Sequence, residues 1–236
     1  MTHAHRPPPD HSAALAQYRR RAGVYDLELA LFEPVRRRAV ERLALRTGDL
    51  VFDVGCGTGL SLPLLQPGVG AAGRLVGIEQ SPEMIALARE RVARHGWNNV
   101  ALIEASVEAA HLKGHADAAL FHFTHDILRE PLAIANVLRH LRPGARIVAC
   151  GLQWASFWAW PVNLFVLGAA RHSVTSLAGL GSPWSLLAAH LQELQVDTMM
   201  AGGVFIASGV LRQPPDRKST RLNSSHERLS RMPSSA

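Results

Sequence analysis

Residues 49–59 read D-L-V-F-D-V-G-C-G-T-G, and this run decides the fold. A short apolar strand ends at Asp53 and leads directly into a turn with three glycines. A second apolar run, 74–78, ends in Glu79, twenty residues after Gly59. A glycine-rich turn after one strand and an acid at the end of the next are typical of nucleoside sites in open α/β sheets. The glycines let the backbone approach a ligand closely, and Glu79 can accept hydrogen bonds from both hydroxyls of a ribose.

The spacing of the glycines indicates which kind of nucleoside to expect. A dinucleotide fingerprint, G-x-G-x-x-G, would place Leu60 or Leu62 at its third glycine, depending on where it starts. The chain instead has D-x-G-x-G-x-G over 53–59, which resembles motif I of the class I methyltransferases that use S-adenosylmethionine (SAM). Asp53 suits the ammonium group of SAM, and the N–H groups of the loop suit its carboxylate. The alternative is a turn whose glycines serve only chain reversal.

Further motifs extend this resemblance over most of residues 18–210. They are G-I-E-Q-S-P-E-M at 77–84, the loop after the fourth expected strand, and L-R-P-G-A-R at 141–146. They look closest to the methyltransferases of quinone and phospholipid biosynthesis. The resemblance implies SAM as cofactor, S-adenosylhomocysteine as product, and a common set of cofactor-binding residues: Asp53, Gly55, Gly57 and Gly59 at the amino-acid end, Glu79 at the ribose, Gln80, Met84, Ser106 and Val107 at the adenine, and Tyr25 flanking the cofactor.

Ser106 departs from the family pattern. Related enzymes often carry Asp at this position, where it accepts a hydrogen bond from the adenine amino group. A hydroxyl can accept the same bond, but it is an uncharged and weaker partner. The backbone N–H of Val107 would still serve a ring nitrogen, so adenine recognition is the least defined part of the expected site.

The order of apolar runs and breakers predicts the fold class. Strands are expected to end at Asp53 and to span 75–79, 100–104, 118–123 and 146–150. Helices are expected at 15–45, 60–65, 81–96, 131–141 and 183–191. Two β-rich runs, 194–200 and 204–211, are separated by Gly202-Gly203 and look like the hairpin that closes a class I methyltransferase sheet. We therefore expect an α/β fold, a Rossmann-like, doubly wound, mostly parallel seven-stranded sheet ending in an antiparallel hairpin.

Composition indicates one soluble domain, with 47% hydrophobic and 19% charged residues. We expect a flexible lead-in at 1–14, the methyltransferase domain at 15–213, and a disordered tail at 214–236 that resembles translated linker sequence and is non-native. The lead-in has no apolar stretch of the kind found in signal peptides, which favours a cytoplasmic location. Cys56 and Cys150 are expected to be small buried side chains, and no Cys or His spacing predicts a metal site.

The net charge of +6 is concentrated near the C-terminus. Residues 217–236 hold five basic side chains and one acid, so the remainder of the chain carries only +2. The charge therefore gives no support for nucleic acid as a partner.

Residues 147–170 contain no charged side chain, which is long enough for a membrane span. Completion of the fifth strand and interruption by Gln153 and Pro161 favour instead a strand followed by an aromatic insertion at about 152–182. Trp154, Trp158 and Trp160 follow the carboxyl end of that strand, where α/β sheets bind ligands. Two interpretations stay open: a hydrophobic insertion that packs on the domain, and a wall for an apolar, lipid-like acceptor with peripheral membrane contact.

Thr124-His125-Asp126 follows the fourth strand, where the resemblance puts the methyl group of SAM. Methyl transfer requires alignment of the nucleophile, exclusion of water and, for some acceptors, removal of a proton. His125 is the candidate base, and Asp126 either orients it or contacts the acceptor; the alternative is that these residues cap a helix. His122 is expected to be a buried histidine of the sheet. Arg36 to Arg38 either bind an anionic acceptor or form a solvated face, and the second interpretation is favoured.

These observations predict transfer of a methyl group from SAM to a small-molecule or lipid-like acceptor. The alternative is a non-catalytic domain that binds SAM or another nucleoside on the same fold, which the departure at Ser106 keeps open. A nicotinamide-linked oxidoreductase is disfavoured because Leu60 occupies the third glycine position of its fingerprint.

Overall fold

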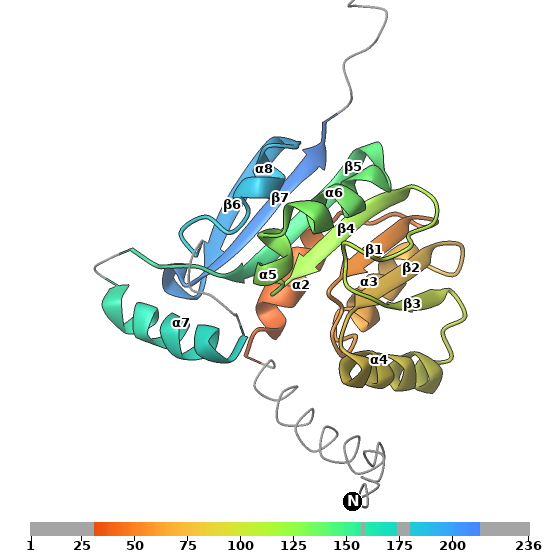
Figure 1. The fold of residues 1–236 in the computed structure, drawn as a ribbon, viewed down its shortest axis with the longest axis horizontal. Coiled ribbons are helices and arrows are strands. Elements are labelled where there is room, and N and C mark those ends of the chain that lie inside the picture. Colours follow the sequence, from red (N-terminus) through yellow and green to blue (C-terminus); the bar gives the residue numbers. More distant parts are fainter. Residues whose placement is uncertain (1–30, 157–158, 174–179, 213–236) are drawn as a thin grey trace, which may run out of the picture.

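The computed structural model describes residues 31–156, 159–173 and 180–212. Tyr25, Trp158, the lead-in at 1–14 and the tail at 214–236 lie outside these ranges. Within them, one twisted sheet carries helices on both faces (Figure 1).

The sheet has seven strands in the order β3-β2-β1-β4-β5-β7-β6. Strands β1 to β5 pair in parallel, and β7 pairs antiparallel to both β5 and β6. This topology confirms the predicted fold class. The strands are β1 Leu50–Val54, β2 Arg74–Glu79, β3 Val100–Glu104, β4 Ala116–His122, β5 Leu141–Leu152, β6 Leu191–Met199 and β7 Val204–Leu211.

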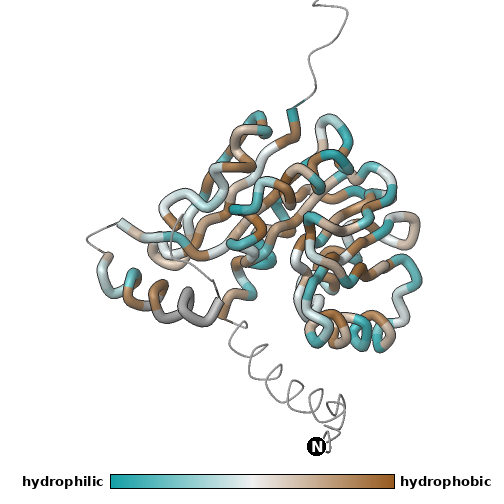
Figure 2. The backbone as a smooth tube through the Cα atoms, viewed as in Figure 1, coloured by the Kyte–Doolittle hydropathy of each residue, from teal (hydrophilic) through white to brown (hydrophobic). Residues whose placement is uncertain are grey.

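Helices cover both faces because successive strand residues point to opposite sides. Val51 belongs to the core that also contains residues of α2 and α3, whereas its neighbour Phe52 belongs to the core that contains residues of α6 and α8. The result is two hydrophobic cores separated by the sheet, and hydrophobic residues fill the central strands (Figure 2). The helices are α2 Glu33–Arg42, α3 Leu62–Val69, α4 Pro82–His95, α5 His125–Leu128, α6 Pro131–Arg139, α7 Trp160–Ser173, α8 Ser185–Ala188 and the 3₁₀ turn η2 Met200–Gly202.

The ends of α4 confirm the sequence-based expectation. Ser81 caps the helix, with its hydroxyl accepting from the N–H of Met84 at 3.3 Å. Pro82 occupies the first helical position. Gly96 ends the helix with φ of 64°, a left-handed conformation that glycine adopts at little cost.

Several element boundaries differ from those predicted. Pro67 lies inside α3, which continues to Val69. β5 begins at Leu141 rather than at 146, because Leu141 pairs with Ala116 and an irregularity absorbs the Pro-Gly step. The helix expected at 183–191 is only the single turn of α8, and the chain enters β6 directly afterwards.

The uncharged run 147–170 is divided between β5 and α7. In the described part of the chain, no helix combines the length and the apolar character that a membrane crossing requires.

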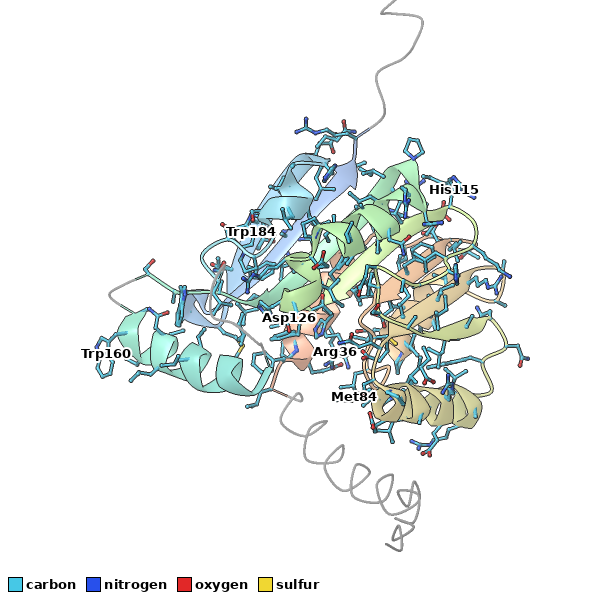
Figure 3. The ribbon with its side chains drawn as sticks, viewed as in Figure 1. Arg36, Met84, His115, Asp126, Trp160 and Trp184 are labelled. Carbon is cyan, nitrogen blue, oxygen red and sulfur yellow. The ribbon has the colours of Figure 1, made fainter. Side chains whose placement is uncertain are left out.

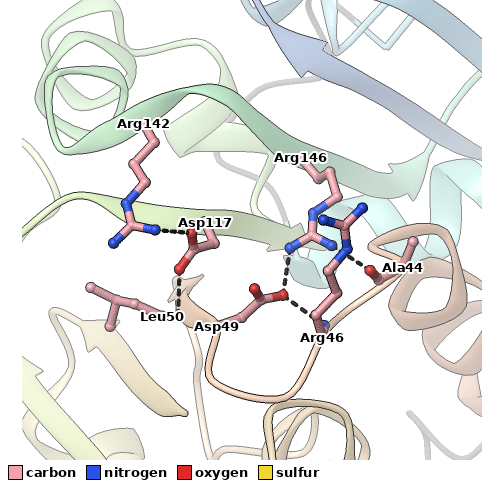
Figure 4. Close-up of polar contacts among 7 residues, drawn as sticks. All are labelled: Ala44, Arg46, Asp49, Leu50, Asp117, Arg142 and Arg146. Atoms are coloured by element: carbon pink, nitrogen blue, oxygen red, sulfur yellow. Dashed lines mark hydrogen bonds and ion pairs between the residues drawn. The ribbon is translucent and has the colours of Figure 1, made fainter.

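Ion pairs join the amino ends of the central strands (Figure 4). Asp49, just before β1, binds the guanidinium of Arg146 in β5. Asp117 in β4 accepts from the N–H of Leu50 at 2.8 Å and from Arg142 at 2.6 Å. These contacts tie β1, β4 and β5 together at the end of the sheet opposite the carboxyl ends, where the sequence predicts the site.

The outer strand β6 contains a bulge. Its pairing with β7 shifts between Gln192 and Gln195, and Glu193 has φ of 55°. An extra residue of this kind bends a strand and interrupts its hydrogen-bond ladder.

Candidate functional site

A cavity of about 400 Å³ opens at the carboxyl ends of β1, β2 and β4. β2 and β4 lie on either side of β1, so the cavity sits where the strand order reverses, the usual ligand position in such sheets. Most of the residues predicted for the site line it together: Asp53, Gly55, Gly57, Glu79, Gln80, Met84, Val107, His125 and Asp126.

The three loop glycines have positive φ, of 70°, 56° and 77°, but they serve different ends. A Cβ at Gly55 would lie 2.5 Å from Cγ2 of Thr124, so this glycine lets the loop after β4 approach the first loop. A Cβ at Gly57 would meet no protein atom within 4 Å, so the backbone there is bare toward the cavity. Gly59 instead abuts Leu62 and Ala88, which indicates a role in helix packing rather than in lining the cavity.

Glu79 connects the two loops. One carboxylate oxygen accepts from the N–H of Gly57 at 3.0 Å, and the other accepts from the N–H of Ser81 at 2.8 Å. Each oxygen keeps a further lone pair. The carboxylate is thus held at the cavity wall in an arrangement suited to two neighbouring hydroxyls.

The first loop has few N–H groups left for a ligand carboxylate. The N–H of Cys56 bonds to Ile78 O and that of Gly59 to Cys56 O, each at 2.9 Å. The N–H of Gly57 already serves Glu79. The sequence-based assignment of the SAM carboxylate to this loop is therefore weakened.

The adenine end differs in one detail from the expected set. Val107 lines the cavity, but its neighbour Ser106 is not among the lining residues. Its hydroxyl instead bonds to the carboxylate of Glu108, which lowers the pKa of that group. Glu108 lines the cavity itself, two residues beyond the position where related enzymes carry an acid. The sequence analysis missed Glu108 because it considered only position 106, where related enzymes carry the acid.

Asp53 is almost completely buried, and its Oδ2 has no hydrogen-bond partner in the described structure. Burial raises the pKa of Asp53 to about 7, with nearby Arg36 opposing this shift and Glu79 adding to it. A cationic ligand group at this position would both pair with the carboxylate and favour its ionised form.

The favoured interpretation of Arg36 to Arg38 as a solvated face is wrong for Arg36. Arg36 is only 2% exposed and lines the cavity, whereas the side chain of Arg37 is 62% exposed. Arg36, Met84 and Asp126 gather around the same hollow in Figure 3. The signal available in the sequence was position, because Arg36 directly follows Val35 on the buried stripe of α2.

His125 is buried, and its ring packs against β5 at Gly151. A Cβ on Gly151 would be 2.6 Å from Cε1 of the ring, so only glycine fits beneath it. Nε2 lies 2.9 Å from the carbonyl of Leu152, and a carbonyl can only accept. Nε2 therefore carries the proton, while Nδ1 has a free lone pair and no partner in the described structure. The orienting hydrogen bond comes from Leu152, and Asp126 sits exposed at the cavity mouth.

Burial lowers the pKa of His125, although the bond to Leu152 and the charge of Asp126 partly oppose the shift. The ring is consequently neutral near pH 7, as an acceptor of a proton must be. His122 ends β4 and also lines the cavity; burial, with the charge of Arg36, lowers its pKa to about 3.

Phe123 stands between these two histidines with φ of 58°, a conformation that side-chain-bearing residues rarely adopt. Its ring meets that of Phe32 edge-on, with 4.8 Å between the ring centroids. Strained residues of this kind cluster at functional sites.

Of the tryptophans proposed as acceptor contacts, Trp154 and Trp160 lie in the described ranges, and neither lines this cavity. Trp154 is 37% exposed, and Trp160 is 65% exposed and points away from the body of the protein in Figure 3. Their contact with an acceptor stays a prediction. In the ranges that the structure describes, no three His, Cys, Asp or Glu side chains are grouped so as to hold a metal ion.

The mostly parallel sheet ends in an antiparallel hairpin, and the loop of Gly57 is hydrogen-bonded to the carboxylate of Glu79 at the cavity. This arrangement is typical of class I methyltransferases. Residues 51–144 match the sequence model of a methyltransferase domain. Residues 51–144 are therefore similar to methyltransferase domains, and the described fold is that of SAM-dependent methyltransferases.

Three relatives illustrate the similarity. Nocamycin O-methyltransferase of Saccharothrix syringae is 30% identical over 159 residues, which are 66% of this chain and 57% of that protein. Aklanonic acid methyltransferase DauC of Streptomyces sp. strain C5 is 35% identical over 37% of this chain and 40% of its own length. N-methyltransferase NodS of Bradyrhizobium japonicum WM9, solved with S-adenosylhomocysteine, shares the fold with a TM-score of 0.58 at 18% identity, over 77% of this chain and 88% of that one.

The chain spans only part of the curated relatives that it matches. The alignments cover 34% of an uncharacterised transposon protein of Streptomyces fradiae and 57% of the nocamycin enzyme.

Proposed function

We propose that this protein transfers a methyl group from SAM to a small-molecule acceptor. The observation that carries the proposal is the hydrogen bond between the two loops, in which Glu79 accepts from the N–H of Gly57 at 3.0 Å. In the same cavity, the buried Oδ2 of Asp53 has no partner in the described structure. When bound, SAM supplies an electrophilic methyl group on its sulfonium.

The residues of the cavity fit SAM by their chemistry. Glu79 would accept from the two ribose hydroxyls, and Asp53 would accept from the ammonium group. Gln80, Met84 and Val107 line the wall at which the resemblance places the adenine, with Glu108 as its acidic acceptor. The bare backbone at Gly57 leaves room for the ligand between these groups.

His125 would act on the acceptor. Because Nε2 donates to Leu152, only Nδ1 can accept a proton. A histidine with a lowered pKa is a weak base, so it suits an acceptor whose own proton is acidic, such as a phenol or an enol. Thr124 lies next to it and has a buried hydroxyl without a partner in the described structure, which could orient the same oxygen.

The name of one relative that is aligned over 66% of this chain supports oxygen as the methylated atom. One relative is a nocamycin O-methyltransferase, and another acts on aklanonic acid by name. The low net charge outside residues 217–236 favours a small molecule over nucleic acid.

The narrower predictions have less support. A lipid-like acceptor of quinone or phospholipid type, peripheral membrane contact and a cytoplasmic location remain proposals. The exposed side chains of Trp160 and Leu164, one turn apart on α7, support a contact with an apolar surface.

Two measurements test the function in sequence. Calorimetric titration with S-adenosylhomocysteine should show saturable binding that Asp53→Ala abolishes; absence of binding by the wild-type protein at millimolar concentration would refute the proposal. Incubation with SAM labelled in its methyl group, together with extracts containing small phenols and carboxylic acids, should label a product. Saturable binding without any transfer would indicate the non-catalytic alternative.

A further inference from the structure

The helix α7 presents apolar side chains to solvent. Trp160 is 65% exposed, and Leu164, one turn further along, is 58% exposed. Leu167 continues the same stripe and is partly exposed. In Figure 3 the side chain of Trp160 points away from the body of the protein. Single exposed leucines are common on protein surfaces, but an aligned tryptophan and leucine on one helix face need an explanation.

The opposite side of α7 is packed and fixed. Val166 is fully buried in the core that also contains Val35 and Ala39 of α2. Asn163 holds the loop before the helix, because its side-chain oxygen accepts from the N–H of Ala155 at 2.8 Å and its Nδ2 donates to the carbonyl of Ala155 at 3.2 Å. These contacts set the orientation of α7, so the apolar stripe is a fixed part of the surface.

The charges around this stripe favour an anionic partner. The sequence has no Asp or Glu between Glu130 and Glu193, so α7 and the loop before it carry no negative side chain. α2 lies on the same face of the sheet, and the side chains of its Arg37 and Arg38 are 62% and 51% exposed. Each pairs with an acid one turn away on α2, at 3.1 and 3.3 Å, and such solvent-exposed pairs are weak.

The turn η2 connects these arginines with α7. Arg37 and Arg38 line a groove together with Met199, the residue before η2. A Cβ at Gly203, the residue after η2, would lie 2.8 Å from Cγ1 of Val162 in α7. Basic and apolar side chains therefore follow one another along this face of the sheet.

We propose that α7 binds an anionic lipid surface, with Trp160 and Leu164 inserted at the boundary between headgroups and acyl chains and with Arg37 and Arg38 facing the headgroups. α7 has 14 residues, fewer than the roughly 20 that cross a bilayer, so it lies parallel to the surface. Tryptophan favours this boundary because its ring is apolar and its N–H is polar.

The area of the stripe argues against a second copy of this chain as its partner. Trp160 and Leu164 together expose on the order of 250 Å², whereas a stable protein interface buries about 800 Å² on each partner. Binding to lipid does not require SAM, so this proposal and the proposed function can fail separately.

Flotation of the full chain with vesicles tests the proposal. The protein should float with vesicles of phosphatidylcholine and phosphatidylglycerol, and less with phosphatidylcholine alone. Leu164→Ser should lower the partition coefficient about 5- to 30-fold, because one apolar side chain no longer inserts. Combined Arg37→Gln and Arg38→Gln should lower it on the mixed vesicles only, by about fivefold for each charge.

Leu132→Ser is the matched control. Leu132 is 68% exposed on α6, whose buried residues Ala133 and Ile134 belong to the core on the other face of the sheet. This variant should keep the wild-type partition coefficient, and circular dichroism should show that both serine variants are folded. Absence of the wild-type protein from the floating fraction of both vesicles, or an equal loss in both serine variants, would overturn the proposal. A wild-type dimer in gel filtration that Leu164→Ser dissociates would show that a second copy covers the stripe, and would overturn it as well.

Discussion

Asp53→Asn should stabilise the protein while removing its cofactor affinity. The carboxylate of Asp53 is buried without a partner for Oδ2, and burial raises its pKa from 3.8 to about 7. In the unfolded chain the group ionises near its ordinary pKa, whereas in the folded protein it keeps its proton until about pH 7. The wild-type protein therefore loses stability as the pH rises between these two values and reaches a plateau above them.

The size of the effect follows from the shift. About three pH units separate the folded and unfolded pKa values, and each corresponds to about 1.4 kcal/mol, which gives about 4 kcal/mol in total. Asparagine has the same shape and no charge, so the variant does not lose stability in this way as the pH rises. The difference in free energy of unfolding between Asp53→Asn and the wild type should therefore increase by about 4 kcal/mol from pH 4 to pH 8. This corresponds to roughly 8–16 °C in Tm.

Urea unfolding of both proteins at pH 4, 6 and 8, followed by circular dichroism, measures this difference. Other titrating groups are common to both proteins and cancel in the comparison. Asp126→Asn, at the exposed mouth of the same cavity, serves as the control and should show no comparable trend. A difference between wild type and Asp53→Asn that stays constant across the three pH values would refute the reasoning. S-adenosylhomocysteine should raise the Tm of the wild type but not that of Asp53→Asn.

Three further outcomes are expected. The affinity of the wild-type protein for SAM should fall about tenfold per pH unit below pH 7, because Asp53 must lose its proton to bind the ammonium; calorimetry between pH 5.5 and 8 checks this, and a flat profile contradicts it. Glu79→Gln should weaken S-adenosylhomocysteine binding roughly 10- to 100-fold by loss of a charged acceptor, whereas Glu104→Gln, on the exposed end of β3, should leave the dissociation constant unchanged. Gly151→Ala should lower stability by about 1–3 kcal/mol because its methyl group would overlap the ring of His125. Thermal unfolding in a His125→Ala background should show that cost largely removed, and an equal cost in both backgrounds would disprove the overlap.

The fold was largely predictable from sequence because its signals are local. A capping serine, a proline at the first turn and a glycine at the end defined α4 without any tertiary information. Where tertiary pairing decided the boundary, the prediction failed: β5 starts earlier than expected because Leu141 pairs with Ala116 despite the following proline and glycine.

The site was predictable to the extent that it depends on motif spacing. The positions of Asp53, Gly57 and Glu79 follow from the order of strands and loops, which the motif encodes. The burial of Arg36 does not follow from the motif, because it depends on how α2 lies across the sheet, and its place next to Val35 on the apolar stripe is the one sign of it in the sequence. The packing of His125 on Gly151 is likewise a contact between α5 and β5 that sequence alone does not reveal.

The bulge at Glu193 has a consequence for how copies of this chain meet. β6 lies at the margin of the sheet and exposes Leu194 and Val196, a combination that invites another strand to add on. The shift in pairing between Gln192 and Gln195 breaks the regular row of backbone donors and acceptors, so an incoming chain finds a short template rather than a full-length one. The irregularity thus disfavours intermolecular sheet growth along this edge, where Leu194 and Val196 are partly exposed.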